Sequence, residues 1–177
     1  MKKVFALFLI LAGFFEIHAQ PREISFFNIF DGTFSTSAVA NISWMQDGEY
    51  YTTIANANRG KEIRKHSILT GEFEVLVTSK SLNEAYPGSG EIDKYQFSQN
   101  EEKLLLQTDV EEIWRRSSKA DYYIYDIPRS EFKKLTQKSG KQQYADFSPQ
   151  GDRAAFVRNN NIYWIDLKTG KEREITT

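Results

Sequence analysis

The sequence predicts an all-β fold of about three four-stranded antiparallel blades of an incomplete β-propeller, preceded by an N-terminal signal segment. Three observations support this prediction. A pattern of roughly fifty residues recurs along the chain. Short runs of alternating apolar residues are separated by Gly, Asn, Asp and Pro, as in hairpin-connected strands. Aromatic residues, which suit the half-buried faces of strands, make up 14% of the chain.

The first 19 residues have the pattern of a secretory signal peptide. Lys2 and Lys3 are positively charged, residues 4–15 form an apolar run, and Ala19 is a small residue before the predicted cleavage site. A membrane-spanning helix needs about 20 apolar residues, and the apolar run at 4–15 has only twelve. We therefore expect this segment to be cleaved, and the alternatives are an uncleaved anchor or a buried helix. Residues 20–177 are then the partial propeller domain of a secreted or periplasmic protein. The lack of cysteine fits a bacterial periplasm better than a disulfide-rich extracellular scaffold.

Each repeat begins with a strand that contains an aromatic anchor, namely Trp44, Phe97 or Phe147. Turn-forming residues follow, such as Ser-Pro-Gln-Gly at 148–151. We expect the three anchors to pack between blades, because one blade cannot cover both of its faces by itself. A β-sandwich with accidental self-similarity is the alternative, but the repeated order of anchor, turn and strand favours the propeller.

Each repeat continues with a second pair of short strands. These are predicted at residues 63–69 and 73–77, 121–127 and 132–136, and 161–167 and 172–176. The three asparagines at 159–161 are interpreted as a hairpin turn. Propellers close with roughly four to eight blades. We therefore expect the ring to be open after Thr177, either in a genuine fragment or in a reading frame that has been cut short.

Two of the connections differ in character. Residues 79–92 contain Pro-Gly-Ser-Gly and are expected to form a plain surface connection. Residues 108–119 lie between two strands of one blade and are predicted to form a long charged loop with an exposed Trp114. Long loops on rigid scaffolds often hold functional residues, so this loop is the candidate functional segment.

The residue types present exclude several kinds of chemistry. The chain has no cysteine, which excludes disulfides, thiolate nucleophiles and cysteine-based zinc sites. A net charge of −1 gives no basis for a nucleic-acid partner. A serine nucleophile needs an imidazole base. The only histidines are His18, in the signal segment, and His66, which is expected to be a surface or blade-packing side chain. No Gly-x-Ser-x-Gly elbow occurs, and we assign no catalytic residue.

The remaining polar candidates lie in the loop at 108–119. Asp109, Glu111 and Glu112 could supply oxygen ligands to calcium, but a solvated acidic loop is the favoured interpretation, and no metal or cofactor is expected. Arg115 and Arg116 are the best site candidates, since an arginine held by a neighbouring Trp presents a planar fork of donors to a carbonyl or carboxylate. On residue chemistry alone, however, a solvated loop arginine is the favoured interpretation.

Three parts of the sequence resemble the dipeptidyl peptidase IV branch of the prolyl oligopeptidase family. Trp-Arg-Arg-Ser-Ser at 114–118, followed by Ala-Asp-Tyr-Tyr-Ile-Tyr-Asp at 120–126, resembles the Trp-Arg-His-Ser-type loop and the strand after it in that family. Residues 29–34 with 42–50, and 147–151 with 154–157 and 161–163, are similar to other parts of the same propeller. The resemblance extends over residues 24–177.

The resemblance implies a fold and an activity for the longer protein. Members have an eight-bladed propeller followed by an α/β-hydrolase domain with a serine-type triad, release X-Pro or X-Ala dipeptides from peptides, and are often homodimeric. It implies that Arg115 helps to hold the substrate backbone. Arg116 stands where some members have His and takes no role. The catalytic Ser, Asp and His and the Glu-Glu pair that binds the substrate amine are not in this chain, so we expect it to be inactive alone.

One alternative function belongs to a different class. A non-enzymatic propeller that binds peptides or proteins could be assembled by oligomerisation of several copies, since stacked repeats gain stability from their neighbours.

Overall fold

The computed structural model describes residues 24–35 and 42–176, so the predicted signal segment at 1–19 lies outside the described residues. The chain divides into two units, residues 1–38 and 39–177. In the first unit, the described part contains the short helix α2 (Phe26–Phe30), which the sequence did not predict. The Ser25 hydroxyl caps it by accepting a hydrogen bond from the Asn28 N–H at 3.2 Å. None of the helix residues is buried.

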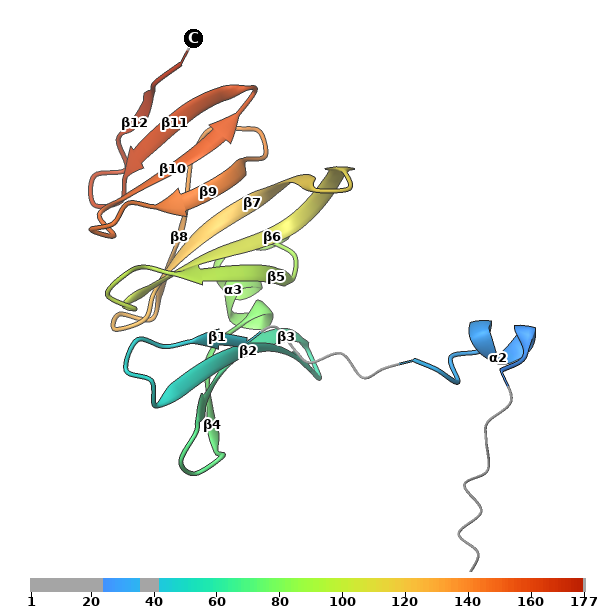
Figure 1. Cartoon of the computed structure of the whole chain (residues 1–177). Helices are drawn as coiled ribbons and strands as arrows, with labels where there is room; N and C mark the ends of the chain where they lie inside the picture. Colours follow the sequence, from blue (N-terminus) through green and yellow to red (C-terminus); the bar gives the residue numbers. More distant parts are fainter. Residues whose placement is uncertain (1–23, 36–41, 177) are drawn as a thin grey trace, which may run out of the picture. The chain divides into compact units, whose positions relative to one another are not determined.

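The second unit contains three four-stranded antiparallel sheets, which confirms the predicted fold class (Figure 1). In each sheet the strands are hydrogen-bonded in chain order. Blade 1 comprises β1 (Ile42–Trp44), β2 (Tyr50–Ala57), β3 (Gly60–Ser67) and β4 (Phe73–Thr78); blade 2 comprises β5 (Ile92–Phe97), β6 (Lys103–Trp114), β7 (Ser117–Asp126) and β8 (Glu131–Lys134); blade 3 comprises β9 (Gln143–Phe147), β10 (Arg153–Arg158), β11 (Asn161–Asp166) and β12 (Glu172–Glu174).

The reversals occur where the sequence contains turn-forming residues. Asn159 and Asn160 both have positive φ, 50° and 66°, between the paired residues Arg158 and Asn161. Positive φ at both central residues is the geometry of a type I′ hairpin turn, which asparagine tolerates better than most residues. The predicted hairpin turn at 159–161 is therefore confirmed.

Blade 2 is buried on both faces, and this explains its sequence. Leu104 and Leu106 pack in a cluster with Ile63 and Val77 of blade 1. Leu105, between them on the strand, points to the opposite face and packs in a second cluster with residues of blade 3 such as Phe156. A strand that is covered on both sides needs no polar alternation, and accordingly Leu104, Leu105 and Leu106 are consecutive.

Two of the three aromatic anchors pack between blades as predicted. Phe97 packs against the cluster between blades 1 and 2, and Phe147 packs against the cluster between blades 2 and 3. Trp44 has the equivalent place in blade 1 but is 66% exposed, because none of the described blades covers that face, so its packing between blades stays a prediction. It pairs with Tyr51, whereas the neighbouring Thr52 on the opposite face bonds to Tyr95 of blade 2 at 2.7 Å. Trp44 therefore lies on the face of blade 1 that points away from blade 2.

The connection at 79–92 also differs from the prediction, because it begins with the helix α3 (Ser79–Ala85). Thr78 caps α3 through a reciprocal capping box with Ser81, and Leu82 is completely buried in the cluster between blades 1 and 2. The helix has a single buried apolar residue, so it leaves no helical periodicity in the sequence. In residues 24–35 and 42–176, no helix is long and apolar enough to cross a membrane.

Candidate functional site

The segment at 108–119 is an extended β-hairpin, and the prediction of a long loop was wrong. Strands β6 and β7 have 12 and 10 residues and stay paired beyond the edge of the blade, past the end of β5 (Figure 1). The pair formed by Trp114 and Ser117 closes the hairpin, with only Arg115 and Arg116 between them. A two-residue reversal of this kind is the tightest common hairpin connection. We call residues 109–119 the arginine hairpin.

The arginine hairpin leaves the blade at a β-bulge. The register of β6 and β7 shifts between Thr108 and Glu111, and Asp109 has a φ of 46°. Aspartate is one of the few non-glycine residues that adopt this left-handed conformation readily. Val110 still packs against the cluster between blades 2 and 3, whereas residues 111–116 are all exposed. The bulge therefore marks the change from buried sheet to projecting hairpin.

The tip of the hairpin presents its polar groups to solvent. Arg115 and Arg116 are exposed, and Trp114 is 80% exposed. Within the described part of the chain, neither arginine side chain has a hydrogen bond or an ion pair, and no cation–π contact joins Trp114 to Arg115. The guanidinium donors of Arg115 are therefore free to bind a group from outside, but Trp114 does not hold them as the sequence had suggested.

Two of the three acidic residues of the hairpin form ion pairs. Glu111 lies 2.9 Å from the Lys119 ammonium on the facing strand, and Asp109 lies 2.8 Å from that of Lys141. Glu112 is opposite Ser118. Among residues 24–35 and 42–176 there is no group of carboxylates and histidines that could hold a metal ion.

His66 lies in blade 1, as a packing side chain on the face that also contains Trp44. Its Nε2 is 3.0 Å from the Thr53 hydroxyl, and its ring stacks on Tyr51 with the centroids 4.7 Å apart. Phe73 covers its other side at 5.4 Å. These contacts agree with the expected blade-packing role.

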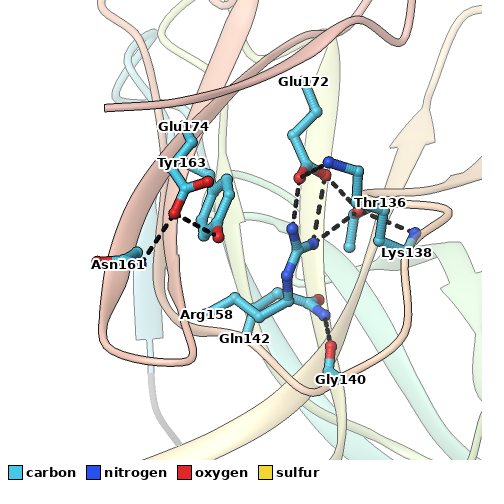
Figure 2. Close-up of polar contacts among 9 residues, drawn as sticks. All are labelled: Thr136, Lys138, Gly140, Gln142, Arg158, Asn161, Tyr163, Glu172 and Glu174. Carbon is cyan, nitrogen blue, oxygen red and sulfur yellow. Dashed lines mark hydrogen bonds and ion pairs between the residues drawn. The ribbon is translucent and has the colours of Figure 1, made fainter. Parts of the chain in front are cut away.

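One buried polar network was not anticipated from the sequence (Figure 2). The side chains of Arg158 and Glu172 are only 5% and 6% exposed, and they form a two-pronged ion pair with N–O distances of 2.5 and 3.3 Å. The Thr136 hydroxyl donates to Glu172 at 2.5 Å, and Lys138 lies 3.1 Å from the same carboxylate. The network joins the connection between β8 and β9 to strands β10 and β12.

The electrostatics of this network are dominated by its hydrogen bonds. Burial alone would raise the pKa of Glu172, but hydrogen bonds from Arg158, Thr136 and Lys138 outweigh burial and lower the pKa from 4.5 to about 2. Arg158 also lies 4.4 Å from the centre of the Tyr163 ring, as a cation–π contact. All of these groups have partners inside the protein, so the network stabilises the blade and offers no open site. Alternation along β10, which places Ala154, Phe156 and Arg158 on one face, was the signal that could have revealed it.

Comparison with known proteins supports a single family. Residues 98–177 match the family model described as the N-terminal region of dipeptidyl peptidase IV. The chain is 30% identical to human prolyl endopeptidase FAP over 142 residues, and 31% identical to a probable dipeptidyl peptidase 4 of Aspergillus fumigatus over 140 residues. These alignments include 80% and 77% of this chain and 17% of each relative.

Solved structures agree with the sequence relatives. The crystal structure of Porphyromonas gingivalis dipeptidyl peptidase 4 superposes with a TM-score of 0.73 at 33% identity, and includes 88% of this chain and 22% of that protein. TolB from Acinetobacter baumannii is similar in fold alone, with a TM-score of 0.53 at 19% identity. The chain thus spans about a fifth of the length of the peptidases that it matches. With its three propeller-type blades, it corresponds to part of the N-terminal β-propeller region of dipeptidyl peptidase IV-like peptidases.

Proposed function

We propose that this region binds peptide substrate in a dipeptidyl peptidase IV-like serine peptidase, and that Arg115 contacts the substrate backbone. One observation is central to the proposal: Arg115 lies at the tip of a projecting hairpin with its guanidinium donors unused by the described residues. The relatives are peptidases, and the resemblance of residues 114–118 to the Trp-Arg loop of the family gives Arg115 its role. Arg116, one residue further on, is assigned none.

The chemistry of the guanidinium suits a peptide backbone. Arginine stays charged at all relevant pH values and offers five N–H donors in a fixed plane. A hydrogen bond from a charged donor contributes about 1.5–3 kcal/mol, so Arg115 alone would give only weak affinity. The arginine hairpin therefore acts as one part of a larger substrate site, together with groups on other segments of the peptidase.

Hydrolysis itself would depend on an α/β-hydrolase domain. The 177 residues contain neither cysteine nor a Gly-x-Ser-x-Gly elbow, and the one histidine after residue 18 is engaged with Thr53 and Tyr51. In the proposed enzyme the blades contribute substrate binding and restrict access to short peptides, and the products would be X-Pro or X-Ala dipeptides. The purified chain should not cleave a chromogenic Gly-Pro substrate.

A titration of the chain with a tripeptide tests the role of Arg115. We expect Ala-Pro-Ala at millimolar concentrations to shift the amide NMR signals of residues 113–118 in the unmodified chain. Arg115→Lys should remove most of this shift, because an ammonium cannot replace the planar fork. The matched control, Arg116→Lys, should retain it. Equal shifts in both variants, or shifts elsewhere only, would contradict the proposal.

We also propose that the protein is secreted or periplasmic. The support is the sequence of residues 1–19, with its two lysines, apolar run and Ala19. Mass spectrometry of the chain produced in a bacterial host with a periplasm should find the mature N-terminus close to Gln20 in the exported fraction. Retention of Met1 on protein in the cytoplasm alone would contradict export.

A second candidate function is a binding propeller assembled from several copies. It is favoured by the aromatic row formed by Trp44, Tyr51, His66 and Phe73, which crosses all four strands of blade 1 on the face opposite blade 2. Exposed apolar patches of this kind often mark interaction surfaces. Light scattering separates the two functions: a sharp, stable oligomer favours the assembled propeller, and a monomer favours the peptidase region.

A further inference from the structure

The base of the arginine hairpin is held by both of the connections that link blade 2 to its neighbours. We propose that Lys141 is a positioning residue for Arg115: through Asp109 it fixes the direction in which the hairpin leaves the blade. The part that concerns Arg115 rests on the proposed function. The part that concerns the hairpin rests on the contacts alone.

Lys141 lies on the connection between β8 and β9 and makes two contacts with one residue. Its ammonium is 2.8 Å from a carboxylate oxygen of Asp109, and it also donates a hydrogen bond to the Asp109 backbone carbonyl. Asp109 is the positive-φ residue of the bulge. Because side chain and backbone carbonyl are both bound, the contact fixes the orientation of the peptide group at the point where the hairpin begins.

The connection between blades 1 and 2 approaches Asp109 from another direction. A Cβ atom on Gly90 would lie 3.4 Å from the Asp109 nitrogen, so the two backbones are close to contact. Gly90 has a φ of 79°, and its carbonyl accepts a hydrogen bond from the Asn83 side-chain amide at 2.7 Å. The bulge therefore lies between two connections. The connection from blade 1 contacts it through Gly90, and the connection to blade 3 contacts it through Lys141.

The facing strand of the hairpin is held at the same level. Ala120 and Gln142 exchange two backbone hydrogen bonds, of 2.9 and 2.8 Å, and both residues are completely buried. Gln142 directly follows Lys141 in the chain, so one short connection binds both strands at the base. Beyond the base, toward the tip, the Glu111–Lys119 ion pair and the backbone pairing hold β6 and β7 to each other but not to the rest of the blades.

Simple geometry shows why the base matters. The tip is six residues from Asp109, which at about 3.3 Å per residue is a lever of roughly 20 Å. A rotation of about 10° at the base would then move the tip by roughly 3.5 Å, whereas productive binding geometry tolerates displacements of about 0.5 Å. Since residues 111–116 are exposed and are not packed against the blades, the base has to set this direction.

The first experiment measures amide hydrogen exchange in the full chain and in the Lys141→Gln variant. We expect exchange at residues 110–119 to accelerate by roughly tenfold, while amides in the three sheets exchange as before. The matched control is Lys65→Gln, because the Lys65 and Lys141 side chains are 22% and 23% exposed and each pairs with a more exposed carboxylate. Lys141→Arg, which keeps the cation, should restore slow exchange. Unchanged exchange in the hairpin, or a uniform acceleration over all three sheets, would overturn the proposal.

The second experiment combines the variants in the tripeptide titration. If Lys141 acts through Arg115, Lys141→Gln should weaken peptide binding roughly tenfold when Arg115 is present and should have no further effect in the Arg115→Lys background. Additive losses would mean that Lys141 does not act through Arg115 and would overturn its positioning role. If Arg115→Lys leaves peptide binding unchanged, the proposed function is wrong, whereas the exchange experiment still decides whether Lys141 orders the hairpin.

Discussion

Protonation of Glu172 should destabilise blade 3, and the size of this destabilisation follows from the contacts of the carboxyl group. The folded protein lowers the pKa of this carboxyl from 4.5 to about 2, because Arg158, Thr136 and Lys138 bond to the charged form. At about 1.4 kcal/mol for each pKa unit, the ionised network contributes roughly 3 kcal/mol to the free energy of unfolding. The side chain is 6% exposed, so solvent screens this contribution little.

The sign of the pH dependence follows from the direction of the shift. A carboxyl whose folded pKa is lowered stabilises the protein fully above its unfolded pKa and loses that stabilisation as the pH falls through the folded pKa. The contribution of Glu172 should thus be complete above about pH 5, fall by about 2 kcal/mol by pH 3, and vanish below about pH 2.

Urea unfolding of Glu172→Gln tests this reasoning. At pH 7 we expect the variant to lose about 3 kcal/mol or more, since it leaves the buried Arg158 without its counter-charge. Between pH 5 and pH 3 its free energy of unfolding should fall less steeply than that of the unmodified chain. The control Glu174→Gln, on the same strand but exposed, should cost under about 1 kcal/mol because an amide oxygen can still accept from Tyr163. Parallel pH profiles for Glu172→Gln and the unmodified chain would refute the reasoning.

Three further predictions concern single side chains. Leu82→Ala should lower the free energy of unfolding by about 2–5 kcal/mol in urea titrations, because Leu82 is completely buried between blades 1 and 2; a loss below 1 kcal/mol would contradict that packing. Asn160→Ala should cost about 1 kcal/mol and Asn160→Gly much less, because the residue has a φ of 66°; calorimetric melting of both variants checks the order. Arg115→Lys should change stability by less than about 0.5 kcal/mol, since its side chain is exposed; a larger change would mean that the guanidinium is bound within the chain.

The repeating units of the fold could be predicted from local pattern. The turn at Asn159 and Asn160 follows from turn chemistry, and the structure has it as expected. The apolar runs at 104–106 and 122–125 are explained by burial of these strands on both faces, which was not predicted. Trp44 could not be placed in the same way. Alternation gives its side of the strand, but only the hydrogen bond between Thr52 and Tyr95 reveals which side blade 2 covers.

The candidate site was less predictable because its determinants are distant in sequence. Charged residues around Arg115 suggested a loop, although the pairing of Glu111 with Lys119 continues the sheet. The contact between Lys141 and Asp109 joins residues 32 positions apart, and no sequence pattern in either segment predicts this contact. Arg158 was easier in principle, since its place in an alternating strand gives it a buried position and a buried arginine requires a partner.

The most direct test of the account uses a complete relative as host. Residues 42–176 would replace the corresponding region of Porphyromonas gingivalis dipeptidyl peptidase 4, with which this chain superposes at a TM-score of 0.73. Kinetics on a chromogenic X-Pro substrate would then compare Arg115→Lys and Arg116→Lys with the parent chimera. We expect Arg115→Lys to raise KM roughly tenfold or more, while Arg116→Lys should leave KM close to that of the parent. An active chimera whose KM is the same with either substitution would contradict the assignment of Arg115 to the substrate.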